Sequence, residues 1–186
     1  MDKIRLAIIG SACRDPAEQK RIRKEHFDWM VETVEIYISE VLETDPSNVI
    51  LVSGGSAWAD HVAVNLYLTG EYAGLNLYFP SEFNHKTKTF KNTHEGRKLN
   101  ELHEICTATT GYDTLHEIFL ATYGKDKARV VVKRGFHPRN TLIAKGCDKL
   151  IAFTFNDSTE PKEGGTLDTW KKFTGDKFHL DLSLAE

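Results

Sequence analysis

The chain has 186 residues, the length of one domain if roughly 150 residues per domain is taken as a guide. Hydrophobic residues make up 40% and charged residues 27%. These fractions are near the globular average and exclude a disordered chain, a collagen-like repeat and a coiled coil. The formal net charge of −3 gives no sign of the basic face of a nucleic-acid-binding protein. No stretch approaches the ~18 apolar residues of a membrane span.

The first part of the chain alternates short apolar runs with helical patterns. Residues 3–9 predict a strand, and a capping box at residues 15–18 opens a long helix whose apolar stripe reaches Val41 and Leu42. Residues 49–52 form a continuous apolar run, which is typical of a parallel strand covered on both faces. A helix with an apolar face follows and ends at Gly70.

The alternation continues to the end of the sequence. Strands are predicted at residues 75–79, 129–133, 150–155 and 178–182, and a polar loop at residues 84–94. Helices are predicted at residues 95–106, 114–124 (opened by a capping box at Thr114), 137–146 and 164–173. This order predicts one α/β domain over residues 1–186, with a Rossmann-like, mostly parallel sheet of five or more strands and helices on both faces.

Four loops are expected to form a single ligand site, because right-handed crossovers bring the loops after parallel strands to one edge of the sheet. Their glycines and first-turn helix residues offer free amide groups, which favour an anion such as phosphate. For Arg139 two interpretations stay open, a contact with a ligand phosphate and a salt bridge to an acidic side chain. The predicted ligand-binding residues are Gly10, Ser11, Arg14, Gly54, Gly55, Ser56, Asp60, Arg139, Asn140, Gly164, Gly165 and Thr166.

Two carboxylates near this edge, Asp60 and Glu82, are candidate catalytic residues. Cleavage of an N-glycosidic bond needs a phosphate anchor and a carboxylate that binds ribose hydroxyls or stabilises positive charge at the anomeric carbon. Asp60 has the alternative role of complementing a helix dipole, and Glu82 that of a helix cap or an exposed charge. The chain has no Walker motif and no His-Glu-x-x-His, and its histidines are scattered. Neither a metal nor a cofactor is predicted.

Four motifs in combination carry a family resemblance. They are Gly-Ser followed by Arg at residues 10–14, Ser-Gly-Gly-Ser-x-x-Ala-Asp at 53–60, Arg-Asn-x-x-Ile-Ala with Asp-x-Leu-Ile-Ala-Phe at 139–153, and Gly-Gly-Thr-x-x-Thr-Trp at 164–170. The chain resembles the SLOG superfamily, which takes its name from DNA-processing protein A and the LOG phosphoribohydrolases, and within it the nucleotide-binding branch of YpsA-type proteins. The resemblance spans residues 4–173 and implies a Rossmann-like fold that binds a nucleotide or a nucleotide-derived ligand.

The chain departs from the phosphoribohydrolase pattern Pro-Gly-Gly-x-Gly-Thr-x-x-Glu, in which the glutamate is catalytic. Thr169 stands at the glutamate position, Asp168 lies one residue away on another side of the helix, and Glu163 replaces the proline. Two functions therefore stay open: a module that senses or sequesters a nucleotide-type ligand, and an N-glycosidic hydrolase acting on nucleoside 5′-monophosphates. A structural or protein-interaction domain is a third alternative.

The expected partner is a small nucleotide-type molecule, rather than a membrane or a nucleic acid. The sequence leaves open whether the chain forms a homo-oligomer. Its three cysteines, Cys13, Cys106 and Cys147, are widely spaced and form no Cys-x-x-Cys. This usage predicts a reduced, cytoplasmic location.

Overall fold

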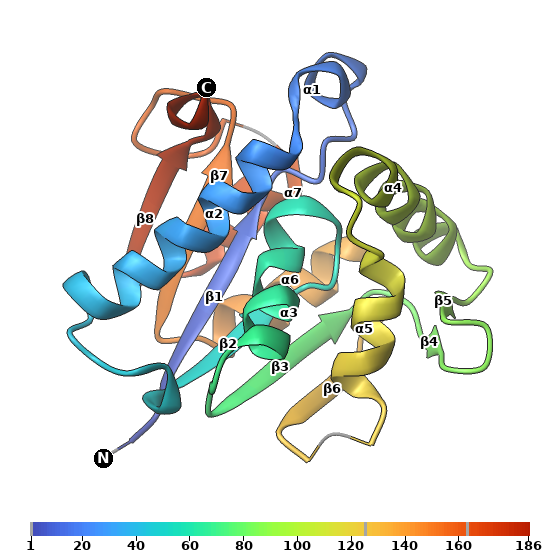
Figure 1. Cartoon of the computed structure of the whole chain (residues 1–186), viewed down its shortest axis with the longest axis horizontal. Helices are drawn as coiled ribbons and strands as arrows, with labels where there is room; N and C mark the ends of the chain where they lie inside the picture. Colours follow the sequence, from blue (N-terminus) through green and yellow to red (C-terminus); the bar gives the residue numbers. More distant parts are fainter. Residues whose placement is uncertain (1, 125, 163) are drawn as a thin grey trace.

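The computed structural model describes residues 2–124, 126–162 and 164–186. At its centre is a six-stranded sheet, in the order β6-β3-β2-β1-β7-β8, in which every strand runs parallel to its neighbours (Figure 1). The predicted α/β class and parallel sheet are confirmed. The strands are β1 (Ile4–Gly10), β2 (Val49–Ser53), β3 (Gly74–Phe79), β6 (Ala128–Val132), β7 (Lys149–Thr154) and β8 (Asp176–Asp181).

Helices connect these strands on both faces of the sheet. They are α1 (Pro16–Arg21), α2 (Lys24–Ile36), α3 (His61–Thr69), α4 (His94–Thr110), α5 (Thr114–Thr122), α6 (Phe136–Lys145) and α7 (Gly164–Lys172). Shorter helical turns are η1 (Tyr37–Val41), η2 (Pro46–Asn48), η3 (Trp58–Asp60) and η4 (Leu182–Ala185). Among the described residues, no helix combines the length and the apolar character needed to cross a membrane.

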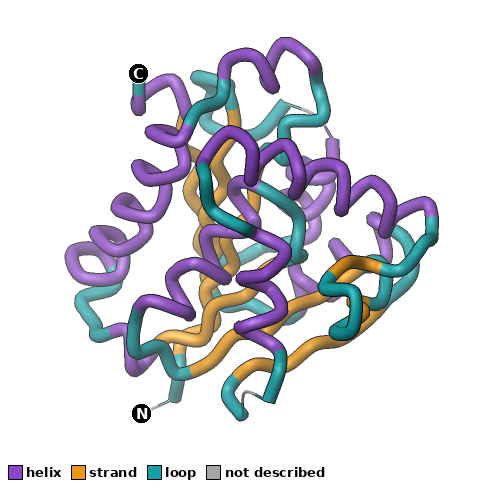
Figure 2. Tube along the Cα trace, turned by 45° about the vertical axis from the view of Figure 1, so that its right-hand side comes forward, coloured by secondary structure: helices purple, strands orange, loops and turns teal. Residues whose placement is uncertain are grey.

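Alternate residues of the strands build two cores, one on each face of the sheet. In β1, Leu6 and Ile8 pack into the larger core with residues of α2, α3, α4 and α5. Ala7 and Ile9 point to the other face, where α6 and α7 cover them. Figure 2 shows the same arrangement, with one twisted layer of strands between helices. Burial on both faces explains why these strands are continuous apolar runs.

The long helix predicted after residue 15 is two helices. Ile22 leaves the helical conformation (φ −68°, ψ 139°) and inserts its side chain into the core, where it is 2% exposed. A new helix then starts at Lys24 and ends in η1, a π-helical turn. The wider turn rotates the last residues of the predicted apolar stripe, and Val41 is 56% exposed.

Two local predictions in the middle of the chain are also corrected. Part of the polar segment expected to be a loop forms an antiparallel hairpin, β4 (Phe83–Asn84) with β5 (Thr89–Phe90). The cap of α5 is Asp113, whose carboxylate accepts a hydrogen bond from the amide of His116 at 3.2 Å. Thr114, predicted as the cap, is buried as the first helical residue, and its hydroxyl lies 2.9 Å from His103 Nδ1.

The order of the strands reverses next to β1. The first four long strands step outward from β1 through β2 and β3 to β6, and β7 then returns to the opposite side of β1, with Gly10 in register with Phe153. In open parallel sheets, ligands bind outside the carboxyl ends of the strands at such a reversal. The fold therefore directs the search for a site to the loops after β1 and β7.

Candidate functional site

A cleft of about 940 Å³ lies at the carboxyl ends of β1 and β7, within the usual size range of small-molecule pockets, roughly 300–1,000 Å³. The loop after β1, the starts of α6 and α7, and the segment after β7 line it. These loops are far apart in the sequence, and the order of the strands in the sheet brings them together. The predicted ligand-binding residues that line the cleft are Gly10, Ser11, Arg14, Ser56, Asp60, Arg139, Asn140, Gly164, Gly165 and Thr166.

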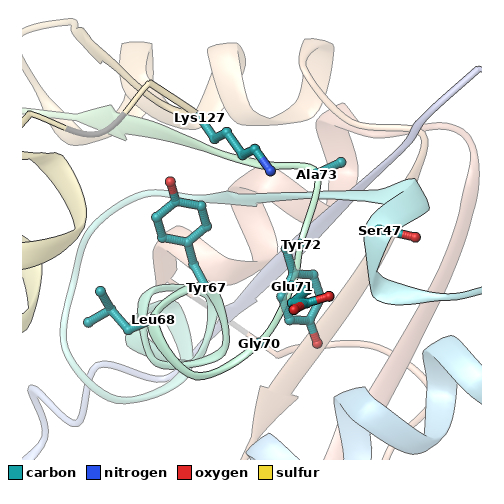
Figure 3. A pocket seen from close by; sticks show the side chains of 8 residues that line it. All are labelled: Ser47, Tyr67, Leu68, Gly70, Glu71, Tyr72, Ala73 and Lys127. Atoms are coloured by element: carbon teal, nitrogen blue, oxygen red, sulfur yellow. The ribbon is translucent and has the colours of Figure 1, made fainter.

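A smaller hollow of about 420 Å³ lies at the opposite edge of the sheet. Figure 3 shows the ammonium of Lys127 and the rings of Tyr67 and Tyr72 around it, beside the chain that leads from α3 into β3. This edge holds the amino ends of the parallel strands, where ligands are not usually bound. None of the predicted site residues lines this hollow, so the larger cleft is the candidate site.

An arginine and a carboxylate meet in the wall of the cleft. Arg139 Nη1 lies 3.9 Å from Asp60 Oδ2, and the two side chains are 7% and 10% exposed. Arg139 Nη1 also donates a hydrogen bond to the carbonyl of Gly54. Burial raises the pKa of the Asp60 carboxyl, and the charge of Arg139 opposes that rise. The structure thus contains the salt-bridge alternative for Arg139, while contact with a ligand stays a prediction.

The two glycines after β2 do not line the cleft, and their loop is not the open amide nest that the sequence suggested. The Gly55 amide donates to Ser53 Oγ at 3.2 Å, and the Gly55 carbonyl lies 2.9 Å from His103 Nε2. A Cβ atom at Gly54 would lie 2.1 Å from Arg139 Nη1. We therefore assign Gly54 a packing role, since only glycine leaves room for the arginine.

A second arginine lies against an aromatic ring of the cleft. The Arg14 guanidinium is 4.3 Å from the ring centroid of Phe136, and the Arg139 guanidinium is 5.7 Å from the same centroid. Cations are attracted to the face of such a ring. Sequence reasoning missed Phe136, because an aromatic residue at the start of a helix is more often part of the core. Its position directly after Gly135 and three residues before Arg139 is the sequence signal that could have identified it.

The loop between β1 and α1 satisfies many of its own polar groups. Ser11 Oγ donates to Glu18 Oε2 at 2.6 Å and accepts from the Cys13 amide at 3.1 Å. Asp15 caps α1 by accepting from the amide of Ala17 at 2.7 Å. Burial raises the pKa of the Cys13 thiol to about 12, so this thiol is not an activated nucleophile. Arg14 and Asp15 are both exposed in this loop and line the cleft. Because the Asp15 carboxylate caps α1, the Arg14 side chain is the cation of this loop that a ligand can reach.

The two candidate catalytic carboxylates lie in different environments. Glu82 is exposed, forms an ion pair with Lys91 and does not line the cleft, whereas Asp60 does. The exposed Lys91 ammonium lowers the pKa of the Glu82 carboxyl. The structure thus brings one of the two carboxylates into the candidate site. Glu18 and Glu95, which were not predicted, line the cleft as well.

The last motif, at residues 164–170, has no free carboxylate at Thr169. This is the position at which the phosphoribohydrolases have their catalytic glutamate. Thr169 lines the cleft, and its hydroxyl donates to the Gly165 carbonyl at 3.1 Å. Asp168 Oδ2 instead accepts from Asn140 Nδ2 at 3.2 Å and from Lys172 Nζ at 2.9 Å, which ties α6 to α7. Glu163, the residue in place of the proline, lies outside the described residues. Among the described residues, no three His, Cys, Asp or Glu side chains gather as metal ligands.

Comparison with known proteins finds one informative relative. The chain is 45% identical over 185 residues to a protein of Acanthamoeba polyphaga mimivirus described as "Uncharacterized protein R261", and the match covers 99% of each chain. No protein-family model matches the chain, and no solved structure matches it. Identity over nearly the full length of both proteins implies a shared fold.

Proposed function

The chain belongs to the same family as this mimivirus protein, and we propose that it binds a nucleotide or a nucleotide-derived ligand in the cleft, as a sensing or sequestering module. The observation that carries the proposal is the charge arrangement around Phe136. Arg14 and Arg139 both lie near this ring, and one buried carboxylate, Asp60, is close to Arg139. Around this ring, two guanidinium groups face one carboxylate, and this local excess of positive charge suits an anionic ligand. The carboxylates of Asp15, Glu18 and Glu95 also line the cleft, so the excess belongs to the surroundings of Phe136 and not to the whole cleft.

The start of α7 supports the proposal that the ligand carries a phosphate. Gly164, Gly165 and Thr166 line the cleft and form the first turn of a nine-residue helix. The first amide groups of a helix have no partner within the helix and carry its positive partial charge. Together with Lys162, which also lines the cleft, this turn offers a phosphate both hydrogen-bond donors and charge.

The aromatic residues of the cleft support the proposal that the ligand also carries a base. Phe136 and Phe155 line it from the starts of two different connections. Arg14 lies over Phe136, and Arg21 lies over Phe155 with its guanidinium 4.4 Å from the ring centroid. Of these two arginines, Arg14 also lines the cleft, and a guanidinium plane held over an aromatic ring is a suitable surface for a base to stack on. On these grounds, and on the four motifs, we also propose membership of the SLOG superfamily.

An N-glycosidic hydrolase is the second candidate function, because Asp60 places a carboxylate in the same cleft. With the phosphate held at α7, a nearby carboxylate would stabilise the positive charge that develops at the anomeric carbon. Thr169 in place of the family's glutamate disfavours this activity. We therefore rank binding without hydrolysis first.

Native mass spectrometry of the purified protein, followed by calorimetric titration with AMP, GMP, CMP and UMP, tests the proposal. We expect a co-purified nucleotide-type mass, or binding of at least one monophosphate with release of no free base over hours. Release of base that is lost in Asp60→Asn would establish the hydrolase instead. Absence of any co-purified ligand and of any binding would contradict both functions and favour a structural domain.

A cytoplasmic location is part of the same proposal. Cys13, Cys106 and Cys147 are all buried free thiols, a state that a reducing compartment maintains. Mass measurement of the protein from its native cells, with and without a thiol-alkylating reagent under denaturing conditions, would count the free thiols. Three alkylated cysteines are the expected result.

A further inference from the structure

Two polar atoms in the wall of the cleft have no hydrogen-bond partner among the described residues. They are Ser56 Oγ and Arg139 Nε. Both residues line the cleft, and they are 5% and 6% exposed. Buried polar groups in native proteins are almost always paired, so an exception calls for an explanation such as a group supplied by a ligand.

Asp60 contacts both residues through other atoms. Its Oδ2 accepts from the Ser56 amide at 3.3 Å and is 3.9 Å from Arg139 Nη1. Among the described residues, none donates a hydrogen bond to Oδ1. The three side chains thus provide a hydroxyl, a carboxylate oxygen and an N–H donor, all on one side of the cleft. We call Ser56, Asp60 and Arg139 the polar wall.

The polar wall differs chemically from the rest of the cleft. A phosphate accepts hydrogen bonds but donates none when ionised, and it would lie close to the Asp60 carboxylate in a poorly solvated place. A sugar hydroxyl can donate to the carboxylate and accept from Arg139 Nε, and it carries no charge. The phosphate of a nucleotide is therefore better served by Arg14 and the start of α7, and its sugar hydroxyls by the polar wall.

The wall is held in place by the surrounding chain. Ser53 Oγ donates to the Asp60 carbonyl at 2.7 Å, and Trp58, between Ser56 and Asp60, is fully buried with φ of 63°. A non-glycine residue keeps this backbone conformation only where the surrounding structure enforces it. The positions of Ser56 and Asp60 are thus set before any ligand arrives.

We propose that the polar wall recognises the ribose hydroxyls of the ligand, so that the protein prefers ribonucleotides to deoxyribonucleotides. This inference rests on the proposed function and specifies its sugar. An enzyme or receptor that hydrogen-bonds a hydroxyl rejects the analogue without it, because its own buried groups are then left unpaired.

The test is a calorimetric titration of the whole chain with AMP, GMP, CMP and UMP and with their 2′-deoxy and 3′-deoxy counterparts. For the nucleotide that binds most tightly, the ribo form should bind about 10-fold or more tightly than at least one deoxy form, as the loss of a hydrogen bond to a charged group predicts. In Ser56→Ala and in Asp60→Asn, the ratio of the affinity for the ribo form to the affinity for the deoxy form should be close to one. Ser56→Ala removes an unpaired hydroxyl, so the melting temperature of the free protein should not fall.

Ser81→Ala is the matched control. Ser81 is 2% exposed, but its hydroxyl is paired with Thr93 Oγ1 at 2.8 Å and it does not line the cleft. This variant should lower the melting temperature and leave the ribo-to-deoxy ratio as in the wild type. Equal binding of ribo and deoxy forms by the wild type, or an equal loss of both in Ser56→Ala, would overturn the ribose assignment while leaving nucleotide binding intact. Failure of every nucleotide to bind would overturn the proposed function itself.

Discussion

Arg139 and Asp60 form a buried ion pair between two connections of the sheet, with Nη1 3.9 Å from Oδ2. Arg139 belongs to the first turn of α6, and Asp60 ends the short turn η3 after β2. The pair therefore joins helices from opposite faces of the sheet across its carboxyl edge. Because both side chains are nearly inaccessible to water, removing either one leaves the other as an uncompensated buried charge.

Arg139→Gln should destabilise the protein strongly, by about 3–5 kcal/mol in the free energy of unfolding, since Asp60 is then buried without its cation. Chemical unfolding monitored by circular dichroism measures this change. The double variant Asp60→Asn/Arg139→Gln should lose less than the sum of the two single variants, because the two residues share one interaction. Strictly additive losses would show that the pair contributes no coupling.

Arg14→Gln should weaken nucleotide binding while leaving the fold intact. The Arg14 side chain is exposed beside Phe136, so its loss removes a charged hydrogen-bond donor, worth about 1.5–3 kcal/mol of binding free energy. Titration calorimetry measures the affinity, and a thermal scan measures the stability. Arg129→Gln, an exposed arginine on β6 that does not line the cleft, is the control. Equal affinities of the wild type and Arg14→Gln would remove Arg14 from the binding site.

Glu82→Gln should change neither nucleotide binding nor any release of base. Its carboxylate is exposed, is paired with Lys91 and lies outside the cleft, and exposed ion pairs contribute little to stability. Chromatography of nucleoside monophosphates incubated with the variant measures base release. A variant that lost activity present in the wild type would restore Glu82 as a catalytic candidate and require the hairpin beside it to move.

Acid should destabilise the protein through His103. This ring is fully buried, and its Nε2 lies 2.9 Å from the Gly55 carbonyl, which can only accept, so Nε2 carries the proton of a neutral imidazole. Burial, followed by the nearby His61, lowers the pKa of His103 to about 3. In the unfolded chain the pKa is about 6.5. As the pH falls from about 6.5 towards 3, the unfolded state gains a proton that the folded state does not, and stability is lost.

The expected slope for this one group is about 1.4 kcal/mol of unfolding free energy per pH unit. Urea unfolding at intervals between pH 6.5 and pH 4.5 measures it. In His103→Gln the dependence on pH should become shallower by this amount, whatever the stability of the variant at neutral pH. An unchanged slope would mean that His103 is protonated in the folded protein.

Much of the sheet could be predicted because buried parallel strands are continuous apolar runs, as in β2 and β7. The break of the first long helix at Ile22 could not, since the sequence continues to favour a helix and only burial of the Ile22 side chain decides otherwise. The hairpin at Phe83 and Phe90 was missed for a similar reason. Its two strands have two residues each, and their aromatic rings pack 5.2 Å apart in an otherwise polar segment.

Sequence reasoning located the residues of the candidate site better than it identified the groups that these residues contact. Strand–loop–helix junctions identified Arg14, Ser56 and Arg139 as neighbours in space, and all three line the cleft. What a side chain contacts depends on elements far away in the sequence. Nothing near Gly54 in the chain indicates that a guanidinium from α6 fills the space above it, and an amide nest was therefore the natural expectation.

The central position of β1 has a consequence for synthesis of the chain. Of the strands of this sheet, β1 is synthesised before the others and obtains β2 as a neighbour early, but its other neighbour, β7, begins only at Lys149. Until then one edge of β1 is unpaired and Ala7 and Ile9 lack the helices that cover them. Such uncovered surface makes a nascent chain prone to association. The cleft exists only once β7 and α7 are in place, so the part of the chain that is synthesised before them lacks the candidate site.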